Sequence, residues 1–286
     1  MEKFSEDTFI GKRFLGMDSS FTEADIVVFG AGFDGTTSFR PGTRFGPSKM
    51  RQESASLETY SPYQDRDIED LRIHDAGDLD LPFGDTRKAL DLIRETFRTI
   101  ITVDKKPVML GGEHLVTYPA IEALHNKFSD LHVIHFDAHT DLREDYLGVS
   151  LSHATVIKKV WDILGDGRIH SYGIRSGLKE EFQFGHEHLD FHPFDLTHVH
   201  QLGERLKGFP VYITLDLDVL DPSIMPGTGT PEPGGVQFKE LLDALLSLDG
   251  LNIVGFDINE LSPPYDPSGI STAVSLKLLR EMLLLL

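Results

Sequence analysis

The sequence contains no cysteine among its 286 residues. Disulfide bonds, thiolate metal ligands and cysteine nucleophiles are therefore excluded, and any metal ion must be held by oxygen and nitrogen atoms. Long apolar runs are also lacking: none approaches the ~18 residues of a membrane-spanning helix, and the opening segment MEKFSEDTFIGKRF has no apolar core of the kind that a signal peptide needs. The sequence predicts a soluble, cytoplasmic protein without a membrane partner.

Basic residues are scarce relative to acidic ones. The chain has 27 Lys and Arg against 46 Asp and Glu, which gives a formal net charge of −19. A molecule of this charge repels a phosphate backbone, so we expect no nucleic-acid partner. The same field favours a small cationic ligand.

Short apolar runs alternate with stretches of helical periodicity, which 90–100 and 238–246 show most clearly. The runs are nearly continuous rather than alternating, as is typical of parallel strands covered on both faces. This order predicts an α/β fold with three layers: a doubly wound, mostly parallel central sheet with helices on both faces. With no linker-like stretch and no internal repeat, we expect a single domain over 1–286. The predicted strands are 24–31, 106–112, 131–139, 169–176, 210–218 and 251–260.

Three long irregular segments, 30–47, 140–152 and 219–237, each follow a predicted strand. Loops of this length in a compact domain are usually functional. Open α/β sheets bind ligands at the carboxyl ends of their strands, which is where these loops would lie.

Metal-type side chains follow four of the predicted strands. Residues two apart in an extended chain face the same side, so the alternating acids and histidine of HFDAHTD can line one cavity. Buried carboxylates repel one another and need cations to neutralise them. Oxygen-rich ligation with some imidazole favours Mn²⁺, with Fe²⁺, Co²⁺, Ni²⁺ and Zn²⁺ as alternatives, and six ligands suffice for two bridged ions. The metal-type side chains that follow the four strands, from which such ligands could come, are His114, Asp137, His139, Asp141, Asp216, Asp218, Asp221, Asp257 and Glu260.

Four motifs, GGEH, DAHTD, SHAT and DLDVLDP, occur in this order and resemble the ureohydrolase family, which includes arginases, agmatinases and guanidinobutyrases. The similarity extends from FDGTTSFRPGTRFGPSKMR (33–51) to DINELSPPYD (257–266) and is greatest towards agmatinases. The resemblance implies an arginase-like fold with two Mn²⁺ per subunit.

The resemblance also implies a role for each metal ligand. One ion would be held by His114, Asp137, Asp141 and Asp216, and the other by Asp137, His139, Asp216 and Asp218, with Asp137 and Asp216 bridging. Asp221 would lie outside the ligand set, in a turn. Glu113 departs from the aspartate of many relatives, but no ligand role is expected for it.

In the family mechanism, a hydroxide bridging the metals attacks the guanidinium carbon. His153 of SHAT matches the general acid or proton shuttle, and Glu260 matches the carboxylate that grips the guanidinium through paired hydrogen bonds. The predicted catalytic residues are thus His153, Glu260 and the ligand Asp141, and the substrate-binding residues are Glu260 and His153.

The substrate is predicted from the loop LREDYLGVSLS, which lacks the asparagines that arginases use for an amino acid head group. Glu144, Asp145 and Tyr146 suit an alkyl ammonium tail, whereas Arg143 does not. We therefore expect agmatine, a small cationic guanidine, to be converted to putrescine and urea. N1-aminopropylagmatine and guanidinobutyrate are the alternative substrates.

Two readings from other classes remain open. A catalytically silent relative could serve as an oligomeric binding subunit, and related folds perform metal-dependent deacetylation, although ligation of two metals disfavours a one-metal deacetylase. Family members are often trimers or hexamers, so a homotrimer or homohexamer is expected. The apolar C-terminal stretch LLREMLLLL is predicted to be a core helix or an interface element.

Overall fold

The main sheet is built from the apolar runs of the sequence. The computed structural model describes residues 9–10, 14 and 16–286, and in them this sheet has nine strands in the order β1-β5-β2-β6-β11-β10-β7-β8-β9. The strands are β1 (Phe9–Ile10), β2 (Ile26–Ala31), β5 (Ile73–Leu79), β6 (Lys106–Gly111), β7 (His132–Phe136), β8 (Ile169–Tyr172), β9 (Asp190–His192), β10 (Pro210–Asp216) and β11 (Asn252–Asn259).

Of the nine described strands in this sheet, eight run parallel and only β1 pairs antiparallel, with β5. Every residue of β2 and β10 is buried, because both faces of the sheet are covered. A separate antiparallel pair consists of β3 (Tyr60–Ser61) and β4 (Arg66–Asp67). All six predicted strands are present, which confirms the predicted doubly wound fold.

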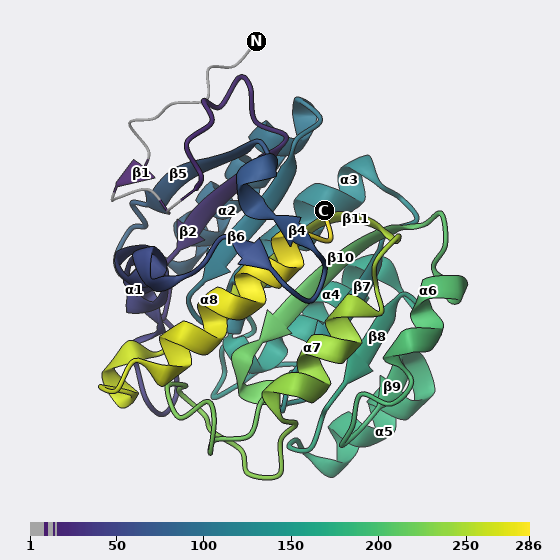
Figure 1. Cartoon of the computed structure of the whole chain (residues 1–286). Coiled ribbons are helices and arrows are strands. Elements are labelled where there is room, and N and C mark those ends of the chain that lie inside the picture. Colours follow the sequence, from purple (N-terminus) through teal and green to yellow (C-terminus); the bar gives the residue numbers. More distant parts are fainter. Residues whose placement is uncertain (1–8, 11–13, 15) are drawn as a thin grey trace.

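Helices cover both faces of the sheet (Figure 1). One core cluster joins a sheet face to α2 (Thr86–Thr102), α3 (Thr117–Lys127), α4 (Val156–Leu164) and α5 (Lys179–His188). The other joins the opposite face to α1 (Gly46–Glu53), α6 (Leu202–Arg205), α7 (Phe238–Leu246) and α8 (Ile270–Leu283), of which α7 and α8 lie in front of the sheet in Figure 1. The predicted periodicity holds in α2, whose Leu90, Ile93, Phe97 and Ile100 are fully buried.

The strand order brings the predicted metal ligands to one edge. The strands β6, β11, β10 and β7 are neighbours, and each precedes one of the polar segments singled out in the sequence. Because these strands are parallel, their carboxyl ends share one edge of the sheet. The last strand of the chain, β11, lies between β6 and β10.

Strand β5 was missed by sequence reasoning because its sequence, IHDAGDL, carries two aspartates. Both pair with the buried guanidinium of Arg51, whose Nη2 lies 2.8 Å from Asp75 Oδ1 and whose Nη1 contacts Asp78 Oδ1. A charge buried in a sheet is tolerated when it is paired and hydrogen-bonded. The periodicity of the strand was therefore hidden by an ion pair whose partner lies in α1.

The C-terminal apolar stretch packs on the core of its own chain. Leu283, Leu284 and Leu285 are 0%, 5% and 6% exposed, so the stretch behaves as a core element here. The opening segment, for which the sequence predicts no signal peptide, lies largely outside the described residues. Across the part of the chain that is described, no helix combines the length and apolarity needed to cross a bilayer.

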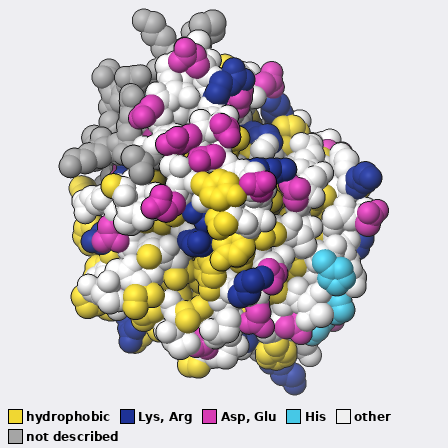
Figure 2. Space-filling model, viewed as in Figure 1, with side chains coloured by type: hydrophobic (Ala, Val, Ile, Leu, Met, Phe, Trp, Pro, Cys, Tyr) yellow, Lys and Arg dark blue, Asp and Glu magenta, His cyan; other side chains and the backbone are white. Residues whose placement is uncertain are grey.

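Figure 2 shows the face that carries α7 and α8. Acidic side chains are spread over it, and lysines and arginines stand among them singly or in small groups. On this face the basic residues form no broad patch of the kind that binds a phosphate backbone.

Gly112 holds the loop after β2 against the turn after β6. A Cβ atom at this position would lie 1.9 Å from Phe33 O and 2.5 Å from Phe33 N, so the two backbones are in direct contact. Gly112 also accepts a hydrogen bond at its carbonyl from the Glu260 N–H, at 2.9 Å. Three of the segments that surround the predicted site meet here.

We expect Gly112→Ala to lower the free energy of unfolding by about 3 kcal/mol, the upper part of the range for overpacking. The measurement is urea denaturation followed by circular dichroism. Gly203→Ala is the control, because its Cβ would meet nothing nearer than Ser247 O, at 3.6 Å. Equal losses of stability in the two variants would contradict the close approach as the cause.

Candidate metal centre and cleft

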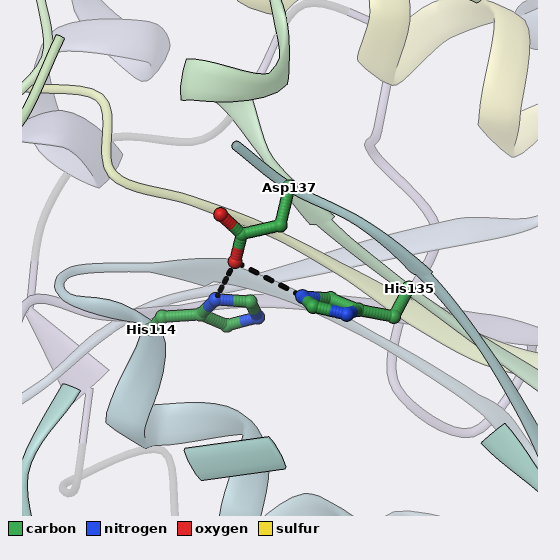
Figure 3. A group of neighbouring side chains, drawn as sticks. All are labelled: His114, His135 and Asp137. Carbon is green, nitrogen blue, oxygen red and sulfur yellow. Dashed lines mark hydrogen bonds and ion pairs between the residues drawn. The ribbon is translucent and has the colours of Figure 1, made fainter. Parts of the chain in front are cut away.

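Asp137 stands at the middle of the candidate centre, directly after the end of β7. Its carboxylate is fully buried, and its two oxygens face different histidines. Oδ2 lies 2.9 Å from His114 Nδ1, and Oδ1 lies 3.5 Å from His139 Nδ1. The contact with His114 is drawn as a dashed line in Figure 3. One side chain therefore belongs to two clusters.

The first cluster surrounds His114, which follows β6. Its Nδ1 lies 3.3 Å from Asp141 Oδ2 and 3.4 Å from Asp216 Oδ2, in addition to the contact with Asp137. One imidazole nitrogen thus meets three carboxylate oxygens, an arrangement that suits a divalent metal ion.

The second cluster consists of Asp137, His139 and Asp218. His139 Nδ1 lies 3.0 Å from Asp218 Oδ2, and one ligand atom from each of the three residues fits within 4.8 Å of the others. The structure therefore brings all six predicted ligands into two adjoining groups, with Asp216 in contact with His114 but not with His139. A bridging position is supported for Asp137 by its two contacts, whereas Asp216 uses Oδ1 to accept the Asp218 N–H, at 2.9 Å.

The tautomer of His114 tests whether the residues fit a metal. His114 Nε2 lies 2.8 Å from Thr214 Oγ1, and that hydroxyl donates its only proton to Asp257 Oδ1, at 2.7 Å. Thr214 must therefore accept from Nε2–H, which leaves the lone pair of the neutral ring on Nδ1. No hydrogen bond of acceptable geometry to this buried Nδ1 is found among the described residues. An orphaned nitrogen facing three carboxylates fits a metal ligand.

The pKa values of the first cluster indicate that a metal ion would replace bound protons. Burial alone would lower the pKa of His114, but the carboxylates of Asp137, Asp141 and Asp216 outweigh it and raise that pKa well above its ordinary value. Burial raises the pKa of Asp141 to about 7, with a further contribution from the charge of Asp137. Burial likewise raises the pKa of Asp216 well above its usual range. Without a metal, protons occupy the centre.

Two of the predicted site residues have a strained backbone. Asp141 has φ 50° and Glu260 has φ 66°, in the left-handed region that residues with a Cβ rarely adopt. Such conformations cost on the order of 1–3 kcal/mol and persist where surrounding structure holds them. Here they turn the chain sharply after β7 and β11, so that both side chains reach the cleft.

Sequence reasoning missed one support of the centre, His135, and singled out another, Asp257, only as one of the metal-type side chains. His135 lies two residues before Asp137 and on the same side of β7, and its Nε2 is 3.0 Å from Asp137 Oδ2 (Figure 3). The alternation H-x-D-x-H-x-D starting at residue 135 was the signal that could have found it. Asp257 is fully buried beneath the ligands and accepts hydrogen bonds from Thr117, Thr214, Tyr212 and Asn259.

A cleft of about 240 Å³ opens onto the centre. His139, Asp141, His153 and Glu260 are among its lining residues, so both predicted catalytic side chains outside the ligand set lie in it. Glu260 Oε1 accepts the His114 N–H, at 2.8 Å, which ties this carboxylate to the first cluster. Burial lowers the pKa of His153 to about 4, so its imidazole is neutral at neutral pH.

The rest of the cleft differs partly from the prediction. Tyr146 lines it, but Glu144 pairs with Lys158 at 3.1 Å and Asp145 caps the turn at Gly148, and neither lines the cleft. Besides the candidate ligands and Glu260, the carboxylate that lines the cleft is Glu181 of α5, which is 6% exposed.

The positive charge of Arg143, which does not suit a cationic ligand, is offset by neighbouring side chains in the cleft. Its Nε lies 3.6 Å from Glu181 Oε1, and its guanidinium stacks on the Tyr146 ring at 4.6 Å. Asp221 lies outside the centre, as expected, because its carboxylate accepts the N–H groups of Ser223, Gly234 and Gly235 in a turn.

The sequence model described as the Arginase family matches residues 24–285. The chain belongs to the arginase family. It is 46% identical over 283 residues to an agmatinase from Bacillus cereus, covering 98% of each chain. It is also 38% identical over 265 residues to an N(1)-aminopropylagmatine ureohydrolase from Thermococcus kodakarensis, covering 88% of each.

Solved structures of the arginase family have the same fold. A structure of the agmatine ureohydrolase of Thermoplasma volcanium superposes with a TM-score of 0.87 at 33% identity, covering 98% of this chain and 95% of that one. These likenesses confirm the predicted family and the predicted enzyme class.

The sharing of Asp137 between two clusters predicts unequal losses of metal. We expect Asp137→Asn to abolish binding of both ions, whereas Asp218→Asn should retain the ion at His114. Metal content per chain after reconstitution with Mn²⁺, measured by inductively coupled plasma mass spectrometry, tests this. Retention of one full equivalent by Asp137→Asn would show that its two oxygens are not shared.

Metal affinity should fall as the pH is lowered through about 7. The metal binds the deprotonated carboxylate, and Asp141 holds a proton below its metal-free pKa of about 7. Protons should therefore be released on binding, which calorimetric titration of chelator-treated protein in buffers of different ionisation enthalpy will count. No proton release at pH 6.5 would contradict the raised pKa of the metal-free centre.

Proposed function

We propose that this chain hydrolyses agmatine to putrescine and urea at a centre of two Mn²⁺ ions. The observation that carries the proposal is the pair of clusters that share Asp137 and open onto a cleft with His153 and Glu260. Surface acids rarely converge in this way, and the relatives named above include an agmatinase and an agmatine ureohydrolase.

The first ion would be held at His114 and the second at His139, with Asp137 between them. Four aspartates and two imidazoles form an oxygen-rich ligand set, which favours Mn²⁺. When bound, two such ions supply a hydroxide at neutral pH, because they lower the pKa of water. The strained Asp141 contributes to catalysis as a ligand of the first ion.

Glu260 orients the substrate. Its carboxylate lies in the cleft and is fixed through Oε1 to the His114 N–H, so a guanidinium bound to it is held beside the first cluster. Charge-assisted hydrogen bonds from a planar guanidinium to a carboxylate fix both distance and orientation.

His153 moves the proton. Because its pKa is lowered by burial, the neutral imidazole can take the proton that the attacking water gives up and then deliver it to the departing nitrogen. The bond between the guanidinium carbon and the nitrogen that carries the alkyl chain breaks. The alkyl guanidinium and water thereby become an alkyl ammonium ion and urea. Atoms and charge balance without any further reactant.

The tail of the substrate would lie towards Glu181. This carboxylate is buried in the cleft wall, where its Oε1 pairs with Arg143 Nε at 3.6 Å and its Oε2 accepts the Leu178 N–H. A buried carboxylate facing a cleft favours an ammonium group over a carboxylate. Agmatine has such a group at the end of its chain, whereas guanidinobutyrate does not.

A second candidate substrate is N1-aminopropylagmatine. A further hollow of about 320 Å³ shares Arg143, Leu178 and Glu181 with the cleft and is also lined by Glu144, Asp145 and Glu180. A longer cation could extend past Arg143 into this acidic hollow. The single domain, the cytoplasmic location and the homotrimer or homohexamer stay predictions.

Urea release from a panel of guanidines tests the proposal. Protein reconstituted with Mn²⁺ should have its highest kcat/KM with agmatine, lower values with aminopropylagmatine and guanidinobutyrate, and the lowest with arginine. A preference for aminopropylagmatine would establish the second candidate. Absence of urea from every compound, with two metals bound, would favour the catalytically silent binding subunit.

His153→Ala should keep both metals and lose activity. We expect kcat for agmatine to fall by ~10²–10⁴-fold, the contribution of a positioned acid or base, because the imidazole contacts no metal ligand in the structure. Urea assays beside metal analysis measure both quantities. Full turnover by this variant would show that another group moves the proton.

A further inference from the structure

We propose that Glu113 is a positioning residue that sets the place and hydrogen bonding of His153 through the hydroxyl of Thr36. The proposal rests on the role of His153 under the proposed function, and it gives a purpose to a buried acid for which no ligand role was expected. Glu113 directly precedes the ligand His114, so one turn after β6 would serve both the metal centre and the proton-transfer residue.

Glu113 is fully buried, and its carboxylate points to the loop after β2. It accepts the Thr36 N–H at 2.8 Å, the Thr36 hydroxyl at very short range, and the Thr37 hydroxyl at 3.3 Å. In return, the Glu113 N–H donates to Phe33 O at 2.7 Å. The loop from Phe33 to Thr37 is thereby fastened to the turn from both sides.

Thr36 connects this loop to His153. Its hydroxyl has one proton, which it donates to Glu113, so towards every other group Thr36 Oγ1 can only accept. It accepts the backbone N–H of His153 at 3.0 Å and lies 3.4 Å from His153 Nδ1. A fully buried carboxylate therefore acts through one hydroxyl on both the backbone and the ring of this histidine.

The ring of His153 is held by two further hydroxyls. Ser38, from the same loop, lies with Oγ 3.3 Å from Nε2 and also lines the cleft. Ser152 lies with Oγ 3.3 Å from Nδ1. When the ring gains a proton during turnover, Nδ1–H faces the obligatory acceptor Thr36, which stabilises the charged imidazole in place.

Thr37 provides a matched comparison within the loop. It donates to the same carboxylate oxygen that accepts the Thr36 N–H, yet none of its contacts in the structure reaches His153. A purely structural role of Glu113, which would anchor the loop as a whole, predicts similar losses at the two threonines. A positioning role predicts that only the loss of the Thr36 hydroxyl affects proton transfer.

The experiment compares Thr36→Val, Thr37→Val, Glu113→Gln and Glu113→Asp in the Mn²⁺-loaded protein. We expect Thr36→Val and Glu113→Gln each to lower kcat for agmatine by about 10- to 100-fold, a part of what a positioned acid or base contributes, and to shift the acidic limb of the kcat–pH profile to lower pH. KM and metal content should stay within about twofold of wild type. Thr37→Val should match wild type, and Glu113→Asp, which keeps a carboxylate, should recover activity relative to Glu113→Gln.

The double variant Glu113→Gln/Thr36→Val separates the pathway from independent effects. Because Glu113 acts through Thr36, the double variant should lose no more activity than the worse single variant. The proposal would be overturned if the fold-losses of kcat in the two single variants multiplied in the double variant. Equal losses in Thr36→Val and Thr37→Val, or an unshifted kcat–pH profile, would also overturn it. Losses that track metal content would overturn it as well.

A readout independent of turnover separates this proposal from the proposed function. Exchange of the His153 C2 proton, followed residue by residue by mass spectrometry, reports the pKa of that imidazole. We expect it to change in Thr36→Val and Glu113→Gln and to stay unchanged in Thr37→Val. If wild type releases no urea, the proposed function fails, whereas unchanged exchange in all variants overturns the positioning role.

Discussion

The centre depends on one electrostatic constraint: four aspartates are buried within contact distance of two imidazoles at one edge of the sheet. Asp137, Asp216 and Asp218 are each at most 3% exposed, so water cannot screen their mutual repulsion. In the absence of a metal, protons on His114 and on neighbouring carboxyls relieve that repulsion, as the raised pKa values of His114, Asp141 and Asp216 indicate. A pair of divalent cations relieves it without removing the negative ligand charges.

The layers of support around the centre follow from the same constraint. Asp257 and Thr214 fix the tautomer of His114 from below, His135 holds Asp137 from the side, and Glu260 holds the backbone of His114 from the cleft. Each support satisfies a hydrogen-bonding group that would otherwise be buried without a partner. The ligand positions are therefore set before any ion arrives.

Local periodicity was sufficient for the central strands of the fold and for the candidate ligands at their ends, which the structure brings together. Continuous apolar runs predicted the central strands, and alternation after β7 predicted which side chains share a face. It was insufficient where a distant partner decides the outcome. The aspartates of β5 concealed the strand, because the pairing of Asp75 with Arg51 is not visible in the sequence. Glu181 could not be assigned to the cleft, because only the tertiary fold brings α5 there.

The residues around the cleft also show the limit of reading a loop by its composition. Glu144 and Asp145 follow the DxHxD segment closely, yet they pair with Lys158 and with the turn at Gly148. Thr36, about eighty positions before the first ligand, approaches His153 instead. Charge predicts a ligand class, but only packing decides which charges a ligand meets.

The position of β11 has a consequence for biosynthesis. This strand follows every other described strand in the sequence, yet it lies between β6 and β10, and it carries Asp257 and leads to Glu260. Until β11 inserts, β6 and β10 have no common neighbouring strand, and nothing in the sheet holds His114 close to Asp216. The cluster around His114 can therefore assemble only after β11 has been synthesised, whereas the residues of the second cluster follow β7 and β10, which pair directly.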